Sequence, residues 1–404
     1  MWIAGRQTAR EPHRFRRRPN AGRGAATTLN DVVAPRLDDV PAALRAVGWN
    51  ARVAALVEEA GAEVPIVDAG IGRVARVDQV SCLVATVDGE RRATMHPLPA
   101  IGDWVLFDPA VHGPETIDDP GRPAHVLTAI LPRWSELARG RGRDGLDRQV
   151  LAVNVDLVLV VVGLDRGVRA RRLEREVLLA WDSGAIPIVV LTKADLHKKP
   201  ERAVRQAAEV VPEVEIVLVN SKAGLGLDRV AELVRDHTAV FLGESGAGKS
   251  TLVNALIGVE KVATGEVRES DNKGKHTTTA RHLFAVPTGG VIIDTPGVRA
   301  LGLGSGEGFS NAYADIQRLA VDCRFRNCNH RSEPGCVVIE AIADGTLDPR
   351  RLAGFHRLGD ELDRLGELAD NRSGDPGGRP ELSAEQHAED HEREPPRRRK
   401  PRPA

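Results

Sequence analysis

An eight-residue segment past the middle of the chain has the composition and spacing of a phosphate-binding loop. It follows an apolar run at 239–242 and consists of Gly243, Glu244, Ser245, Gly246, Ala247, Gly248, Lys249 and Ser250. Its glycines allow the backbone to curl around phosphate groups, so that successive N–H groups point inward at the positive end of the following helix. The pattern therefore predicts that Lys249 contacts the β- and γ-phosphates of a nucleotide and that Ser250 coordinates Mg²⁺.

Two tetrapeptides that precede this loop predict that the bound base is guanine. The first, Thr192-Lys193-Ala194-Asp195, fits the pattern [NT]-K-x-D at the end of an apolar run. The Asp195 carboxylate can accept hydrogen bonds from the ring N–H and the exocyclic amine of guanine, whereas adenine lacks this donor pair and would leave the carboxylate unpaired. The second, Val219-Asn220-Ser221-Lys222, also ends an apolar run, and we expect Ser221 and Lys222 to support the base.

Two later segments predict a response to the γ-phosphate. Asp294-Thr295-Pro296-Gly297 fits D-x-x-G, which predicts that Asp294 holds Mg²⁺ through water and that the Gly297 N–H contacts the γ-phosphate. The segment 273–279 ends in three threonines, and a threonine hydroxyl in such a switch completes the Mg²⁺ shell when the γ-phosphate is present. The predicted magnesium ligands are Ser250, Thr278, Thr279 and Asp294.

These motifs occur in a rotated order along the chain. An ordinary GTPase has the phosphate loop first and the base-reading loop near the end, whereas here 192–195 and 219–222 precede 243–250. The site depends on strand ends that meet in space and not on chain order, so the same site can form. One consequence is that the second switch, after Gly297, continues directly into the C-terminal part of the chain. We expect nucleotide state to be coupled mechanically to that part.

The residues after Gly297 do not include the glutamine that positions water in Ras-like enzymes. The sequence continues Val298-Arg299-Ala300-Leu301, and a valine cannot orient water. Either hydrolysis is slow or another group has this role, and His276, in the first switch segment, is the polar candidate. On the residues alone, His276 could also be a solvated loop residue.

Three cysteines and a histidine near the C-terminus have the types and spacing of a zinc site. Cys323, Cys328, His330 and Cys336 fall within 14 residues and supply a closed tetrahedral set, which indicates a structural ion. Buried cysteines without a metal are the alternative, and a redox role is disfavoured because there is no C-x-x-C. The basic residues between the ligands, such as Arg324 and Arg326, suit RNA phosphates.

Two kinds of element must position these residues. Short alternating runs at 72–77, 82–87 and 101–106, with Asp88-Gly89 as a hairpin turn, predict a small β-barrel of the oligonucleotide-binding or SH3-like type. From about residue 149, buried strands alternate with helices, which predicts a parallel sheet covered on both faces. The predicted strands are 157–162, 187–191, 215–219, 240–242 and 291–293, and the predicted helices are 37–62, 171–181, 227–235, 250–256 and 348–368.

Composition limits the partners and the location that can be expected for the chain. The formal net charge is −1, so the overall charge does not indicate a nucleic-acid partner. The two ends differ from the rest, because the first 30 residues hold seven arginines against one acid and the last residues are also basic. We expect both tails to be disordered, with RNA binding as the alternative. No apolar run is long enough to span a membrane, so a cytoplasmic protein is expected. Cys82, in an apolar strand pattern, is expected to be a small core residue.

Together these residues resemble the circularly permuted, small-ribosomal-subunit-dependent GTPases of the RsgA type, over roughly residues 70–360. The resemblance rests on 192–195, 243–251, 274–279 and 294–297, on Asn154-Val155-Asp156 and on the zinc set. The predicted GTP-binding residues are Thr192, Lys193, Ala194, Asp195, Ser221, Lys222, Gly243, Glu244, Ser245, Gly246, Ala247, Gly248, Lys249, Ser250, Thr251, Asp294 and Gly297. Thr192 and Lys222 depart from commoner residues, which predicts a modest guanine affinity.

The resemblance implies a fold class: an α/β phosphate-loop GTPase domain, circularly permuted, with an N-terminal oligonucleotide-binding (OB-like) barrel and a C-terminal zinc-binding, helical domain. We expect a basic extension with a short helical segment at 1–65, the barrel at 66–135, the GTPase domain at 145–304, the zinc domain at 305–368 and a disordered tail at 369–404.

The resemblance also implies an activity. It implies GTP hydrolysis with Mg²⁺, stimulated by the small ribosomal subunit and its rRNA, and a role in late maturation of that subunit with release upon hydrolysis. His276 would position the attacking water, so His276 and Lys249 are the predicted catalytic residues. We expect a monomer with one structural zinc ion. The alternative is an RNA-binding module in which the guanine-nucleotide site is slow and mainly structural.

Overall fold

The structure is a computed structural model, and it describes residues 40–61, 70–116, 119–141, 147–258, 282–294 and 308–373. The basic start of the chain, most of the tail and both predicted switch segments lie outside these residues. The switch residues concerned are His276, Thr277, Thr278, Thr279 and Gly297. Residues up to Leu362 belong to one compact unit, and a second unit begins at Asp363.

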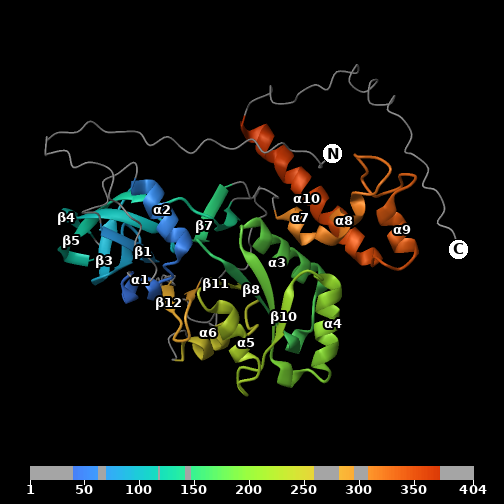
Figure 1. Ribbon diagram of the computed structural model, residues 1–404, viewed down its shortest axis with the longest axis horizontal. Helices are drawn as coiled ribbons and strands as arrows, with labels where there is room; N and C mark the ends of the chain where they lie inside the picture. The colour runs from blue at the N-terminus through green and yellow to red at the C-terminus, as the bar shows by residue number, and fades with distance from the viewer. Residues whose placement is uncertain are drawn as a thin grey trace, which may run out of the picture. The chain divides into compact units, whose positions relative to one another are not determined.

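Two short helices and a closed barrel form the first part of the described chain (Figure 1). The elements are α1 (Ala42–Ala46), α2 (Ala51–Gly61), β1 (Gly70–Val77), β2 (Cys82–Thr86), β3 (Gly89–Thr94), β4 (Trp104–Thr116) and β5 (Asp119–Ile130). The strand order is β1-β2-β3-β5-β4, with β3 parallel to β5 and with β4 closing on β1. A five-stranded Greek-key barrel of this order is of the oligonucleotide-binding type, which confirms the OB-like expectation.

Three local predictions in this part were slightly wrong, each at a glycine with positive φ. The helical pattern of 37–62 is interrupted after α1, where Gly48 has φ 92°. The strand expected from Ile101 begins at Trp104, because Gly102 turns the chain with φ 94°. Thr86 pairs with Gly89, so the hairpin turn is Val87-Asp88 and not Asp88-Gly89. Cys82 is fully buried, as expected of a small core residue.

A six-stranded sheet follows a two-stranded ribbon that the sequence did not predict, β6 (Glu136–Arg141) with β7 (Asp147–Val153). The sheet strands are β8 (Leu157–Gly163), β9 (Ile186–Thr192), β10 (Glu215–Leu218), β11 (Thr238–Gly243), β12 (His282–Ala285) and β13 (Val291–Asp294). Their order is β10-β9-β8-β11-β13-β12, and the pairs are parallel except for the edge strand β12. The predicted parallel sheet is thus confirmed, and its antiparallel edge is an addition.

Helices cover the sheet on both faces. Helices α3 (Ala170–Asp182) and α4 (Pro200–Val210) share one apolar core with the sheet, through residues such as Val177 and Ala207. Helices α5 (Leu227–Val234) and α6 (Lys249–Ile257) share the other, through residues such as Val230 and Leu252. Two single-turn helices, η2 (Leu164–Arg166) and η3 (Ala194–Leu196), follow β8 and β9 at the carboxyl edge of the sheet.

The rotated motif order fits this sheet. Strand β11, which leads into the phosphate loop, is paired with β8 on one side and with β13 on the other. Strands β9 and β10, which precede the two tetrapeptides predicted to read the base, lie beyond β8, and the D-x-x-G strand is β13. The chain leaves β8 and β11 toward opposite sides, so the crevice at their carboxyl ends is the switch point at which such sheets bind ligands.

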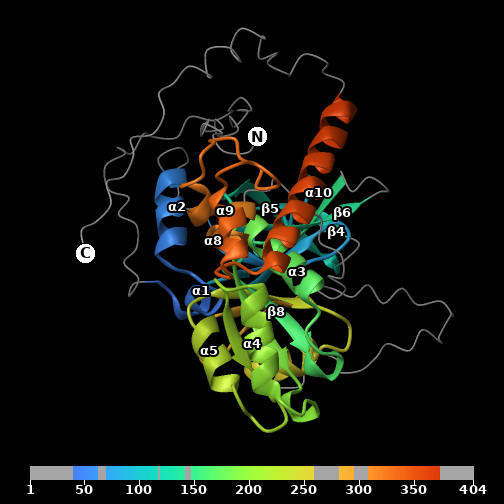
Figure 2. The ribbon, with the colours of Figure 1, turned by 90° about the vertical axis from the view of Figure 1, so that its right-hand side faces the viewer.

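The C-terminal part is helical. It contains α7 (Phe309–Ala312), α8 (Ala314–Ala320), α9 (Val337–Ala343) and α10 (Pro349–Ser373), the last of which covers the predicted helix at 348–368 from its second residue and extends five residues further. The first part of α10 lies beside α3 in both views (Figures 1 and 2), and Arg175 of α3 pairs with Glu361. Within the described ranges, no helix has the length and apolar character needed to cross a membrane.

Candidate functional site

The predicted phosphate loop joins β11 to α6. Gly243, Gly246 and Gly248 have φ values of 142°, 75° and 98°, which side chains other than hydrogen rarely tolerate. A Cβ on Gly243 would also stand 2.3 Å from the Val161 carbonyl oxygen. The Lys249 ammonium donates hydrogen bonds to the Gly243 and Glu244 carbonyls at 2.8 and 2.6 Å. The loop therefore has the curled backbone, the helix start and the positioned lysine that the motif requires.

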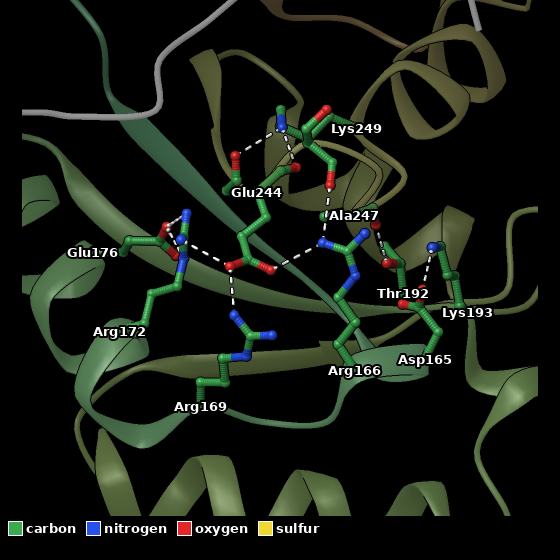
Figure 3. Close-up of polar contacts among 12 residues, drawn as sticks. Asp165, Arg166, Arg169, Arg172, Glu176, Thr192, Lys193, Glu244, Ala247 and Lys249 are labelled. Atoms are coloured by element: carbon green, nitrogen blue, oxygen red, sulfur yellow. Dashed lines mark hydrogen bonds and ion pairs between the residues drawn. The ribbon is translucent and has the colours of Figure 1, made fainter. Parts of the chain in front are cut away.

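The tetrapeptide 192–195 touches this loop directly. Thr192 is buried, and its hydroxyl donates a hydrogen bond of 2.5 Å to the Ala247 carbonyl. Lys193 has φ 57°, and its ammonium lies 2.8 Å from the Asp165 carboxylate (Figure 3). Lys193 holds the pKa of Asp165 below its usual value, against a smaller effect of burial. Asp195 lies in η3 and is exposed, which leaves its carboxylate accessible for a base.

The second tetrapeptide lies next to the first. The Ala194 N–H donates to the Val219 carbonyl at 3.3 Å. The Asn220 side-chain oxygen accepts from the N–H groups of Lys222 and Ala223 at 3.1 and 3.3 Å, so Asn220 shapes the loop that carries Ser221 and Lys222. This role of Asn220 was missed, although an asparagine that bonds to the backbone two residues on is a known turn signal.

Of the predicted magnesium ligands, Ser250 and Asp294 lie in the described part, and Thr278 and Thr279 do not. Ser250 is in the first turn of α6, beside Lys249, and Asp294 ends β13. Burial raises the pKa of the Asp294 carboxyl, while the charges of His282 and Lys249 lower it. His282 stands opposite Asp294 in the β12–β13 pair. A partly buried carboxylate of this kind favours a nearby cation, which fits Mg²⁺.

The predicted zinc residues come together at the start of the C-terminal part. The ligand atoms of Cys323, Cys328, His330 and Cys336 all lie within 4.8 Å of one another. The Cys323 and Cys336 sulfurs are 3.9 Å apart, and His330 Nδ1 lies 3.3 Å from the Cys336 sulfur. Ligands about 2.3 Å from a tetrahedral zinc ion stand about 3.8 Å from one another, so the cluster fits a structural zinc. His330 has φ 55°, which aims its Nδ1 into the cluster.

Three arginines that the sequence did not single out converge on the phosphate loop (Figure 3). Nη1 of Arg169 and Nη1 of Arg172 each lie 2.9 Å from Glu244 Oε1. Nη1 of Arg166 lies 3.5 Å from both Glu244 Oε2 and the Ser245 carbonyl. Arg166 lies in η2, Arg169 precedes α3 and Arg172 lies in its first turn, so the cluster of arginines directly after a buried strand would have been the signal.

The segment Asn154-Val155-Asp156 connects the barrel to the sheet. The Asn154 side chain donates to the Gly102 carbonyl at 3.0 Å, and an Asp156 carboxylate oxygen accepts from the Thr238 N–H at 2.8 Å. Between them lies Arg73, fully buried, which donates to the Thr238 hydroxyl at 2.9 Å and to the Asn154 carbonyl at 3.0 Å. Burial lowers the pKa of Arg73 to about 10. The segment therefore has a structural role at this joint.

Comparisons with known proteins agree with this geometry. A family model described as RsgA GTPase matches residues 130–304. A small ribosomal subunit biogenesis GTPase RsgA of Streptomyces coelicolor is 44% identical over 314 residues, which cover 75% of this chain and 83% of that protein. A protein of the same name from Methanosarcina acetivorans is 38% identical over 266 residues, 65% of this chain and 70% of that protein.

Two solved structures share the fold. YjeQ from Thermotoga maritima superposes with a TM-score of 0.54 at 23% identity, over 73% of this chain and 98% of that one. YloQ, described as a circularly permuted GTPase, superposes with a TM-score of 0.53 at 22% identity, over 73% of this chain and 96% of that one. Both support the permuted arrangement of the sheet.

Proposed function

The chain belongs to the RsgA GTPase family, and from this premise we propose that it hydrolyses GTP while bound to the small ribosomal subunit and acts in the late maturation of that subunit. Relatives that cover about three quarters of the chain are named for this role. The observation that carries the proposal within the molecule is the contact of Thr192 with Ala247, which joins the guanine-reading loop to the phosphate loop. The alternative, an RNA-binding module with a slow, mainly structural guanine-nucleotide site, would share this contact, and the rate of hydrolysis separates the two.

In the proposed reaction, Lys249 and the backbone N–H groups of Gly243–Ser250 hold the phosphates, and Asp195 accepts hydrogen bonds from guanine, next to Ser221 and Lys222. Ser250 and Asp294, with Thr278 or Thr279, would hold Mg²⁺, which neutralises charge on the β- and γ-phosphates when bound. Gly297 contacts the γ-phosphate, and His276 orients the attacking water. Since the residues after Gly297 include no glutamine at the usual place, His276 is the side chain on which water activation depends.

Coupling to the subunit follows from the chain order. The D-x-x-G strand β13 is followed, after the second switch, by the helical part that carries the zinc cluster. A switch whose conformation depends on the γ-phosphate would shift this helical part and so change its affinity for rRNA. Release of the protein upon hydrolysis is the expected result. The partner places the protein in the cytoplasm, where we expect it to act as a monomer.

Co-sedimentation tests this proposal. The full chain is mixed with small ribosomal subunits in the presence of a non-hydrolysable GTP analogue or of GDP, and bound protein is measured after centrifugation. The proposal predicts stoichiometric binding with the analogue and weaker binding with GDP, by tenfold or more for a coupling of about 1.4 kcal/mol. Equal binding in both states would contradict a nucleotide-dependent role, and binding to large subunits alone would contradict the proposed partner.

A further inference from the structure

Beside the phosphate loop, on the side of α3, lies a shallow cleft whose lining carries more positive than negative charge. It is lined by Gly163, Arg166, Arg169, Arg172, Glu244 and Ala247, among others. The three guanidinium groups face two carboxylates, those of Glu244 and Glu176. With all five groups charged, the net charge is +1, and burial raises the pKa of Glu176. At least one positive charge is therefore left for an anion at this edge of the loop.

The three arginines differ in how closely they contact the neighbouring carboxylates. Arg172 contacts both Glu244 and Glu176, at 2.9 and 2.8 Å, and Arg169 contacts Glu244 at 2.9 Å. Arg166 approaches Glu244 and the Ser245 carbonyl only at 3.5 Å, and nearly half of its side chain is exposed. Arg169 is still more exposed, at 58%, but its contact is short, so Arg166 has the weakest contacts of the three and can change partner at little cost.

Arg166 is also the arginine nearest to the curled backbone. Its Nη2 lies 3.6 Å from the point where a Cβ on Gly246 would stand, which places the guanidinium over the Ser245–Gly246 part of the loop. The N–H groups of such a loop point at the phosphates of a bound nucleotide. Figure 3 shows the side chain extending from η2 toward this part of the loop. The guanidinium therefore lies beside the part of the backbone that would face the phosphates.

We propose that Arg166 acts as an arginine supplied in cis, which contacts the γ-phosphate during hydrolysis, with Glu244, Arg169 and Arg172 holding the segment around it in position. In the reaction, water attacks the γ-phosphorus, the bond from that phosphorus to the β–γ bridging oxygen breaks, and GDP and inorganic phosphate leave. Negative charge spreads over the γ-phosphoryl oxygens as this happens, and a guanidinium placed there lowers the barrier. Arg166 is then a second catalytic side chain beside His276, with a different task.

The test is single-turnover GTP hydrolysis by the full chain, with saturating small ribosomal subunits and without them. The variants are Arg166→Ala and Arg166→Lys, with Arg171→Ala as the matched control, an exposed arginine in the first turn of α3 for which no contact with Glu244 is found. We expect Arg166→Ala to lower the rate by about 10²-fold or more in both conditions, with the affinity for GTP changed by less than about threefold. Arg166→Lys should recover part of the rate, and Arg171→Ala should match the wild type. Binding of GDP with aluminium fluoride should be lost in Arg166→Ala while binding of GDP alone is kept.

The inference is overturned if Arg166→Ala hydrolyses GTP within about twofold of wild type, or if the loss of rate is matched by an equal loss of GTP affinity. It is also overturned if only the subunit-stimulated rate falls and more subunit restores it, because Arg166 would then contact rRNA. The inference rests on the proposed GTPase function, and the two failures differ. A wild-type chain without any hydrolysis refutes the function, whereas an active wild type with an equally active Arg166→Ala refutes the arginine alone.

Discussion

The hydroxyl of Thr192 donates a hydrogen bond to the carbonyl of Ala247, at 2.5 Å, in a buried position between two strand ends. Thr192 is the first residue of the tetrapeptide that we propose reads guanine, and Ala247 lies in the phosphate loop. The contact means that the loop for the base and the loop for the phosphates are held in one geometry. A threonine in the place where many GTPases have an asparagine therefore still supplies a donor to the phosphate loop.

Because of this contact, removal of the Thr192 hydroxyl should weaken nucleotide binding. Thr192→Val keeps the shape of the side chain but leaves the Ala247 carbonyl without this partner, at a cost of about 1–3 kcal/mol. We expect the affinities for GDP and GTP to fall by roughly 5- to 150-fold. Titration with a fluorescent guanine nucleotide measures this, and Thr192→Ser, which keeps the hydroxyl, is the control. Unchanged affinity in Thr192→Val would show that the contact does not organise the site.

Asp195 predicts base specificity. In Asp195→Asn, one carboxylate oxygen becomes an NH₂ donor, which faces the donor groups of guanine and should weaken GTP binding by about 10²-fold or more. Xanthine carries a carbonyl where guanine has its amine, so XTP should bind better to the variant than to the wild type. Competition between GTP and XTP for binding to each protein measures this change in base preference. If the variant prefers GTP as strongly as the wild type does, Asp195 does not read the base.

The cysteine and histidine cluster predicts one zinc ion per chain. Cys328→Ser removes one thiolate from a tetrahedral set, so the metal content should drop well below one per chain. Because the ligand atoms lie within 4.8 Å of one another, loss of the ion would leave three buried or partly buried thiols around empty space, and the C-terminal helices should unfold at a lower temperature. Elemental analysis and thermal unfolding are the measurements, with Cys82→Ser, outside the cluster, as the control for metal content. A wild-type chain that folds without bound metal would contradict the assignment.

A buried charge network predicts how firmly α3 is attached to the C-terminal helices. Glu174 of α3 pairs with Arg357 and, at 3.7 Å, with Arg351, which is 4% exposed and also pairs with Asp315 at 2.9 Å. Glu174→Gln should lower the free energy of unfolding by about 3 kcal/mol, the lower end of the range for a broken buried pair, because Asp315 remains.

The matched control for this network is Glu361→Gln, which removes a partly exposed pair between the same two helices, with Arg175. Exposed pairs contribute about 0–1 kcal/mol, so the control should lose little stability. Urea unfolding followed by tryptophan fluorescence gives both values, since Trp181 lies in α3. Equal losses in the free energy of unfolding of the two variants would show that the burial of Glu174 does not increase its contribution to stability.

Much of the sheet could be predicted because its strands are continuous apolar runs. Strands β8, β9 and β11 consist almost entirely of buried residues, so their positions can be predicted from composition, and β9 and β11 lead into motifs. Strand β12 and the ribbon of β6 and β7 were missed. β12 has four partly exposed or exposed residues with no clear alternation, and its pairing with β13 depends on a long-range contact that no local pattern records.

The phosphate loop, the base-reading loops and the zinc cluster could be predicted because each is a short segment whose spacing is fixed by its ligand. The residues that hold these segments could not. Arg73 occupies a strand position in which a charged side chain normally points to solvent, yet it is fully buried where the barrel meets the sheet. Arg166 and Glu244 are 78 residues apart, and only the parallel pairing of β8 with β11 brings them together.

We propose that this chain is a subunit-stimulated GTPase in which His276 orients the attacking water. Multiple-turnover GTP hydrolysis, measured for wild type and His276→Ala with and without small ribosomal subunits, tests it most directly. We predict that subunits accelerate the wild type and that His276→Ala, which still binds GTP, is slower by about 10²-fold or more in their presence. No acceleration of the wild type by subunits, or a His276→Ala variant as fast as the wild type, would contradict the claim.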